Sequence, residues 1–276
     1  MTMTTTKTSR SNSEIYSFSK LSCFSQCRYQ YYLKYVLPKS ERPPAKENAF
    51  SLYGQFVHGL LEQYENGDIT LEDLPIKYEE EFDVMVSEEF PQSPNPKISL
   101  FDSYYDSGLK FLRGYKGQAP KYTVEGVEEY FTEDIDGIQV RGFIDLELKD
   151  NSDGSIIIHD WKSKSSIKTN SDKKKYGRQL YLYSKHIFDK YGVWPKTLRL
   201  YLFRKDEPVD IQFTMDGYNE AVEWMKNQVL DIHTCMDWDE YNYDKFFCNH
   251  LCEFRESCKW KEIAEFDCQQ GGNSKS

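Results

Sequence analysis

The seven cysteines of this 276-residue chain lie only near its two ends. Two occur in the first 27 residues and five in the last 42, whereas the 207 residues between Cys27 and Cys235 contain none. Because an odd number of cysteines cannot all pair in disulfides, metal ligation is the main alternative to buried free thiols. If the cysteines bind one metal site, the fold must bring the two ends of the chain together.

Composition and charge restrict the possible functions. Hydrophobic residues make up 39% of the chain, which is sufficient for a globular core. The formal net charge is −10, so the molecule as a whole does not attract nucleic acid or an anionic membrane, and any site for a polyanion must be local. Residues 62–90 carry eleven carboxylates against one lysine, which predicts a solvated acidic helix face.

The sequence has no window of roughly 18 consecutive apolar residues, the length that a membrane span needs, and residues 1–13 have no apolar signal segment. We therefore expect no membrane contact and a cytoplasmic location, which would be the host cytoplasm for a viral protein. Residues 1–13 and 269–276 are polar, and we expect both to be disordered tails.

The hydrophobic period changes along the chain from helical to alternating and back. Helices are predicted at 17–36, 52–64, 78–90, 100–116, 173–191 and 217–234, and strands at 123–131, 140–148, 155–161, 197–205 and 209–214. Asp136-Gly137 and Asp153-Gly154 separate the first three strands and predict tight hairpins, since both central positions of a type I′ turn need positive φ. This order of elements predicts an α/β or α+β chain with a central sheet.

The strand IIIHDWK at 156–162 combines an apolar run with an acid and a base. Side chains of a strand alternate between its faces, so Asp160 and Lys162 share one side, and the preceding hairpin can set Asp145 beside Asp160. Two neighbouring carboxylates repel each other unless a cation neutralises them, and a hard divalent ion is the usual solution. The alternative is a salt bridge between charges at the end of a hairpin.

A basic stretch follows this strand. Residues 162–178 contain seven basic residues and one acid, Asp172. Phosphate contacts need such local charge, and tyrosines offer surfaces on which unpaired bases stack. The candidate contacts with DNA are Lys164, Lys168, Lys173, Lys174, Lys175, Tyr176 and Arg178. The alternative is an exposed lysine-rich loop without a partner.

Four short motifs occur in order along the chain, and each is anchored by two residues: Gly54 and His58, Gly142 and Asp145, Asp160 and Lys162, and Gln179 and Tyr183. Their combination resembles the motifs G-x-x-x-H, G-x-x-D, D-x-K and Q-x-x-x-Y of the RecB-type branch of the PD-(D/E)XK nuclease superfamily. The resemblance covers residues 50–190. It implies a restriction-endonuclease-like core, in which a central mixed sheet is flanked by helices.

The resemblance also implies a mechanism. Mg²⁺ or Mn²⁺ would be held by His58, Asp145, Asp160 and the backbone carbonyl of Trp161, and Lys162 would place the attacking water. The catalytic set would then be Asp145, Asp160, Lys162, Gln179 and Tyr183. The expected activity is hydrolysis of DNA phosphodiesters, by an exonuclease that acts on single strands or free ends. No P-loop pattern occurs in the sequence, so we expect any helicase or recombinase partner to act in trans.

The cysteines extend the resemblance. The segment SFSKLSCFSQC resembles the opening of the iron-sulfur members of this branch, which include the AddB nuclease subunit and the CRISPR-associated four-cysteine exonucleases. It implies a 4Fe-4S cluster on Cys27, Cys248, Cys252 and Cys258. Two departures are that Arg28 replaces a proline and that one extra residue separates Cys248 from Cys252. Spacing alone leaves zinc open as the metal, with His250 as a possible substitute ligand, and Cys23 is the alternative to Cys27.

These implications divide the chain into a single nuclease domain over residues 14–268. Its core would span residues 50–235, and an iron-sulfur subdomain would combine residues 14–44 with residues 236–268. Two other functions stay open: a non-catalytic DNA-binding or recombination accessory protein that retains the fold, and a zinc-dependent interaction protein whose acidic helix at 72–89 binds the partner.

Overall fold

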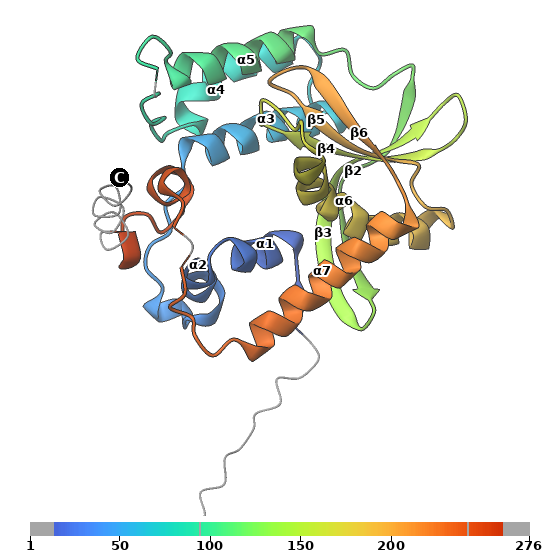
Figure 1. The fold of residues 1–276 in the computed structure, drawn as a ribbon. Helices are drawn as coiled ribbons and strands as arrows, with labels where there is room; N and C mark the ends of the chain where they lie inside the picture. The colour runs from blue at the N-terminus through green and yellow to red at the C-terminus, as the bar shows by residue number, and fades with distance from the viewer. Residues whose placement is uncertain (1–13, 94, 242, 262–276) are drawn as a thin grey trace, which may run out of the picture.

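The computed structural model describes residues 14–93, 95–241 and 243–261. The tails predicted at 1–13 and 269–276 lie outside these residues, as does Cys268. One mixed sheet forms the centre of the described part (Figure 1). Its strands are β1 (Ile15–Tyr16), β2 (Tyr122–Ile135), β3 (Ile138–Asp150), β4 (Ile156–Lys162), β5 (Thr197–Leu202) and β6 (Glu207–Gln212).

The strand directions are mixed, as predicted. β2, β3 and β4 form an antiparallel meander, β5 runs parallel to β4, and β6 returns antiparallel to β5. β1 pairs in parallel with β3 and was not predicted, because two residues are too few to show a period. β5 is shorter than predicted and β6 begins two residues earlier, since a turn at residues 203–206 separates them.

The two Asp-Gly hairpins differ. Asp136 and Gly137 both have positive φ, 53° and 82°, as a type I′ turn requires. In the second connection only Gly154 is left-handed, with φ 74°, and five residues at 151–155 join β3 to β4. The prediction of a tight turn there was wrong, although the hairpin itself forms.

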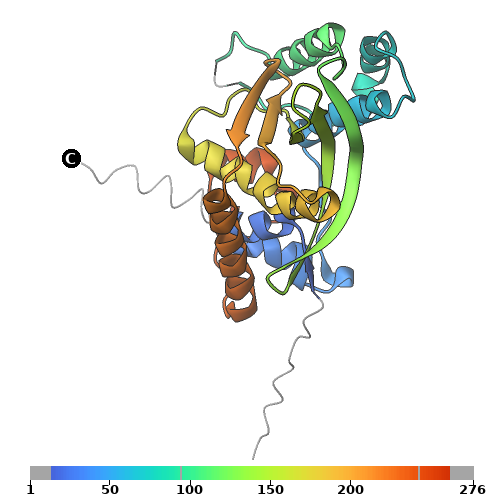
Figure 2. The ribbon, with the colours of Figure 1, turned by 90° about the vertical axis from the view of Figure 1, so that its right-hand side faces the viewer.

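Helices cover both faces of the sheet (Figures 1 and 2). One face carries α3 (Ala49–Glu65), α4 (Asp73–Met85) and α5 (Leu100–Gly114), and the other carries α1 (Phe18–Gln26), α6 (Asn170–Tyr191) and α7 (Met215–Thr234). Alternate residues of β4 serve the two cores: Ile156 and Ile158 contact the α6 side, and Ile157 and Trp161 contact the α3 side. The predicted α/β class is therefore confirmed.

Several helix boundaries differ from the prediction. The helix predicted at 17–36 is interrupted at Cys27, which is extended (φ −161°, ψ 116°), and continues as α2 (Arg28–Tyr31) and a π-helix at Tyr32–Val36. α4 begins five residues earlier than predicted and ends at Met85. α6 begins at Asn170 rather than at 173, because Thr169 and Asp172 form a capping box at its start.

The two ends of the described chain meet beside α2. The Tyr29 backbone N–H donates to the Glu240 carbonyl (3.1 Å), and Lys34 forms an ion pair with Glu253 (2.7 Å). A π-helix at Phe247–Leu251 lies next to this junction, and a small core of its own includes Leu33 and Phe254. None of the described helices is long and apolar enough to cross a membrane.

Candidate active site

Asp145 and Asp160 lie opposite each other across the β3–β4 ladder. The strand register pairs Leu146 with His159, and the next step along both strands brings the two aspartates together. The Trp161 backbone N–H donates to Asp145 Oδ2 (2.7 Å), which fixes that carboxylate at the end of β4. Strand alternation thus produces the neighbouring carboxylates that the sequence predicts.

His58 reaches the same place from α3. Asn48 caps the start of this helix, and the apolar face of the helix is buried at positions that include Val57 and Leu61. The His58 Nε2–H donates to the Trp161 carbonyl (2.8 Å), while Nδ1 lies 3.5 Å from Asp145 Oδ2. Burial lowers the pKa of His58 and favours the neutral imidazole, which is the form that binds metals.

Lys162 lies beside the carboxylates and is held by α6. Its Nζ is 2.5 Å from Asp160 Oδ2 and donates to Gln179 Oε1 (3.2 Å), and Gln179 Nε2 donates to the Tyr183 hydroxyl (3.3 Å). Burial alone would lower the pKa of Lys162, but Asp160 and Asp145 raise it overall, so the ammonium persists. The predicted lysine, glutamine and tyrosine therefore form one connected row.

The glycine of the second motif has a steric role. A Cβ on Gly142 would lie 2.6 Å from the ring of Tyr183, so only glycine lets that tyrosine approach β3. Gly54 is less restricted, since the nearest atom to its Cβ would be Ser163 Oγ at 3.5 Å. In the first motif, packing therefore does not require Gly54 to be glycine, and His58 is the residue that contributes to the site.

Glu128 of β2 joins the site and was missed by the sequence analysis. Ligand atoms of His58, Glu128 and Asp145 lie within 4.8 Å of one another. The pairs Val127–Leu146 and Glu129–Ile144 flank Glu128 and Asp145, so these two carboxylates are opposite each other. Glu128 also has φ 47°, a strained conformation for a residue other than glycine, and such strain concentrates at functional sites.

The electrostatics of the group favour the binding of a cation. Burial and the nearby Asp160 raise the pKa of Asp145 to about 8, and burial and Asp145 raise the pKa of Glu128 to about 7. Carboxylates with such raised pKa values are destabilised when ionised unless a positive charge is close. Oxygen donors with one imidazole suit Mg²⁺ or Mn²⁺, so the residues present fit a divalent ion.

Asp160 and the Trp161 carbonyl adjoin this group without forming its centre. Asp160 is engaged by Lys162, and the Trp161 carbonyl accepts the hydrogen bond from His58. The mutually close donors are therefore His58, Glu128 and Asp145. The ligand set implied by the resemblance does not include Glu128.

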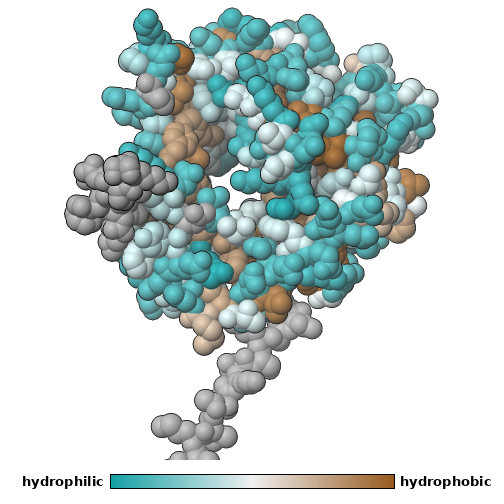
Figure 3. All heavy atoms as spheres, in the orientation of Figure 1, coloured by the Kyte–Doolittle hydropathy of each residue, from teal (hydrophilic) through white to brown (hydrophobic). Residues whose placement is uncertain are grey.

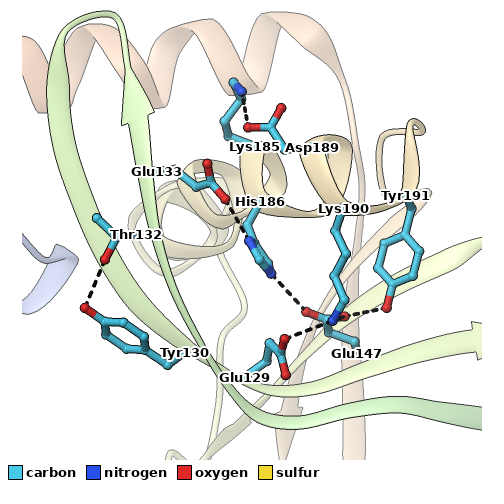
Figure 4. A network of polar contacts seen from close by, with 10 residues as sticks. All are labelled: Glu129, Tyr130, Thr132, Glu133, Glu147, Lys185, His186, Asp189, Lys190 and Tyr191. Carbon is cyan, nitrogen blue, oxygen red and sulfur yellow. Dashed lines mark hydrogen bonds and ion pairs between the residues drawn. The ribbon is translucent and has the colours of Figure 1, made fainter.

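A network behind the site attaches α6 to β3 (Figure 4). Glu147, two residues beyond Asp145, is fully buried and accepts hydrogen bonds from Lys190 Nζ (2.9 Å) and the Tyr191 hydroxyl (2.7 Å). His186 contacts Glu133 (2.8 Å) and lies 3.6 Å from Glu147. Because α6 carries Gln179 and Tyr183, this network fixes the helix that holds Lys162.

The predicted DNA-contacting residues divide into two sets. Lys164 and Lys175 lie over the ring of Tyr176, at 4.8 and 5.8 Å from its centre. Lys174 instead pairs with Glu220 of α7 (2.7 Å), and Arg178 lies over the ring of Trp224, also on α7. Lys168 is exposed and Lys173 is half-buried. The basic stretch is a loop only as far as Thr169 and a helix beyond it.

The structure brings the four cysteines of the predicted cluster to one place. Cys27, Cys248, Cys252 and Cys258 all line a cavity of about 30 Å³ where the chain ends meet. Cys23 does not line it, although burial raises its pKa to about 12, and His250 packs on Phe246 instead. The indole N–H of Trp260, which also lines the cavity, is buried without a hydrogen-bond acceptor among the described residues.

Comparisons with known proteins identify the class. The sequence matches the profile of the PD-(D/E)XK nuclease superfamily over residues 15–259, so the chain belongs to a class of nucleases. It is a member of the PD-(D/E)XK nuclease superfamily, whose enzymes use divalent metals. The match covers the whole central sheet, the acidic group and all four cysteines that line the cavity at the chain ends.

One solved structure supports this fold. A crystal structure from Eubacterium rectale, described as a "Putative exonuclease", is similar with a TM-score of 0.51 and 14% identity, over 95% of this chain and 93% of that chain. At this identity the likeness shows the fold alone. The structure of SSO0001 is 15% identical over 75% of this chain and 96% of that chain, and its TM-score of 0.32 is too low to show a common fold. Among curated proteins, none matches the sequence.

Proposed function

We propose that the protein is a metal-dependent DNA exonuclease of the RecB-type branch, which hydrolyses phosphodiesters at single strands or DNA ends. The observation that carries the proposal is the convergence of His58, Glu128 and Asp145 beside the Asp160–Lys162 pair. Three carboxylates from β2, β3 and β4, an imidazole from α3 and an ammonium from β4 are the groups that metal-assisted phosphodiester hydrolysis needs.

Each residue has a role that follows from its contacts. His58, Glu128 and Asp145 would hold Mg²⁺ or Mn²⁺ together with Asp160 and the Trp161 carbonyl. The ion, when bound, polarises the scissile phosphate and lowers the pKa of water. Lys162 keeps its positive charge next to Asp160, so it stabilises charge on the phosphate and orients the attacking water. Gln179 positions Lys162, and Tyr183 positions Gln179.

The surroundings favour a single strand or a free end as substrate. Figure 3 shows a hollow near the middle of one face, between α3 and α1, where much of the visible rim is hydrophilic. Lys164, Lys175 and Tyr176 combine positive charge with an aromatic ring near Lys162, an arrangement that binds backbone phosphates and stacks unpaired bases. Lys168 and Lys173 extend the charge, while Lys174 and Arg178 contribute less because α7 engages them.

We also propose that Cys27, Cys248, Cys252 and Cys258 hold a 4Fe-4S cluster that joins the chain ends structurally. In the described residues, no three cysteine sulfurs lie within 4.8 Å of one another, whereas tetrahedral zinc needs separations of about 3.8 Å. A cluster of several metals holds its thiolates farther apart, and the unpaired Trp260 N–H would donate to its sulfur. Residues 14–268 would then be one nuclease domain with a core at 50–235.

The substrate and direction can be tested together. Single-stranded and duplex DNA, labelled at either end and with or without a block at each end, would be incubated with the protein and Mg²⁺ or Mn²⁺. We expect mononucleotides or short fragments to be released from unblocked single-stranded ends, and no release in EDTA. DNA binding without metal-dependent cleavage would instead identify an accessory protein that retains the fold, and cleavage of blocked DNA would identify an endonuclease.

A further inference from the structure

A second cavity lies on the opposite side of β4 from the candidate active site. It has a volume of about 320 Å³, at the lower end of the range of small-molecule pockets. The loop that follows α5, the start of β2, and strands β4 and β5 enclose it. Because β4 alternates, His159 faces this cavity while the adjacent Asp160 faces the candidate metal site.

His159 is the feature of this cavity that the nuclease site does not explain. It is 1% exposed, and neither of its ring nitrogens has a hydrogen-bond partner among the described residues. Its ring packs against Tyr201 (5.4 Å between centroids, 16° between planes) and Trp161 (4.1 Å). A buried polar group without a partner costs free energy, so such a group at a cavity indicates a missing ligand.

The cavity is positively charged although the chain is acidic. Its charged lining residues are Lys116, Lys121, Arg199 and Asp206, and because Asp210 pairs with Arg199, the excess charge comes from the two lysines against Asp206. Arg199 is 8% exposed, and Asp210 holds its guanidinium through two hydrogen bonds (2.7 and 2.8 Å). The two lysines are exposed at the rim and can reach a bound anion.

Aromatic rings form the walls. Tyr115, Tyr122 and Tyr201 line the cavity, and the Arg199 guanidinium lies 5.2 Å from the centre of the Tyr122 ring. Flat aromatic walls select a planar heterocycle, and lysines at the rim select a phosphate. The neutral form of an imidazole adds one donor and one acceptor, which can pair with the edge of a base.

We propose that this cavity binds a nucleoside monophosphate, with the base against Tyr201 and His159 and the phosphate near Lys116 and Lys121. The site is separate from the nuclease centre and shares only strand β4 with it. A nuclease that releases mononucleotides would supply this ligand, but binding itself does not depend on the proposed function.

The test is calorimetric titration of the full-length protein with deoxyadenosine monophosphate in EDTA, where the nuclease centre holds no divalent ion. We expect saturable binding, weakened about tenfold or more when Lys116→Ala and Lys121→Ala are combined. His159→Phe keeps the ring and the volume and should also weaken binding. Lys162→Ala, on the other side of β4, should bind like the unaltered protein, and circular dichroism would verify that each variant is folded.

Three results of the nucleotide titrations would overturn the proposal. They are no binding at millimolar nucleotide, binding that Lys162→Ala removes, and binding that the combined Lys116 and Lys121 substitutions leave unchanged. Inorganic phosphate and deoxyadenosine serve as separate probes: equal affinity for phosphate and for the nucleotide would show an anion site that does not recognise the base, against the proposal. The variant that combines Lys116→Ala and Lys121→Ala should also cleave DNA at the unaltered rate. A failure of the proposed nuclease function and a failure of nucleotide binding therefore remain distinguishable.

Discussion

The carboxylate group and the four-cysteine cavity are built in opposite ways. Glu128, Asp145 and Asp160 come from three consecutive antiparallel strands, so the ladder itself places them. Cys27 and Cys252 are separated by more than 200 residues, and a small core with Leu33 and Phe254, together with polar contacts such as the Lys34–Glu253 ion pair, joins their segments. The comparison teaches that the sheet alone places the side chains of the first site, whereas the proposed cluster would stabilise the second site by joining the two chain ends.

The largest expected effect is at the strand-built site. Asp145→Asn should lower metal-dependent DNA cleavage at least about a hundredfold, because it removes a ligand at the centre of the group. The fold should survive, because the raised pKa of Asp145 indicates that its ionised form is destabilised by burial and by the nearby Asp160. A neutral amide at this position removes that cost. Adding Mg²⁺ should raise the Tm of the unaltered protein and leave that of the variant unchanged, as thermal scans would show.

The cysteine site should respond in the opposite sense, mainly through stability. Cys252→Ser should release the cluster and lower the Tm by about 10 °C, because metal binding there is also folding energy. Cys23→Ala and Cys235→Ser are matched controls, since neither residue lines the cavity. Anaerobically purified protein should be brown with about four irons per chain. One zinc per chain and no colour would contradict the assignment of an iron-sulfur cluster. Loss of iron in Cys23→Ala would show that Cys23, not Cys27, is the N-terminal ligand.

A smaller effect separates the two ligand sets proposed for the strand-built site. Glu128→Gln should weaken Mn²⁺ binding about 10-fold to 100-fold, whereas Glu125→Gln, exposed on the same strand, should not. Titration of each variant with Mn²⁺, followed by electron paramagnetic resonance, measures this difference. Equal Mn²⁺ affinities of the Glu128→Gln and Glu125→Gln variants would exclude Glu128 as a ligand and favour the set that contains Asp160 instead.

The smallest effect concerns DNA affinity. Replacing Lys164 and Lys175 together by alanine should weaken single-strand binding several-fold and reduce the slope of log K against log salt by about 1.4, since two phosphate contacts are lost. Lys174→Ala is the control, because Glu220 already neutralises that lysine. A control that weakened binding as much as the double variant would show that the charge on α7 also faces the DNA.

Sequence reasoning recovered most of the strand-built site and less of its surroundings. Asp145 and Asp160 could be paired because strand alternation and a hairpin fix their relation. Glu128 could have been found in the same way: counting outward from the Asp136-Gly137 turn brings it opposite Asp145. It was missed because β2 contains several acids at irregular spacing and no local pattern distinguishes one of them.

Tertiary contacts override local pattern in the elements that were predicted wrongly. The apolar period continues through Cys27, yet the helix breaks there, where the C-terminal segment packs against the chain. The second Asp-Gly pair has the residues of a tight turn, but five residues connect β3 to β4. The lining of the 320 Å³ cavity combines four elements, and no spacing in the sequence relates His159 to Lys121.

The most direct measurement is the rate of nucleotide release from end-labelled single-stranded DNA in Mg²⁺ by the unaltered protein and by Asp160→Ala. The account predicts metal-dependent release by the first, and a loss of at least about a hundredfold by the second with an unchanged fold. Asp160→Ala that degraded DNA at the unaltered rate would contradict the placement of the nuclease centre beside Asp145 of β3 and Asp160 of β4.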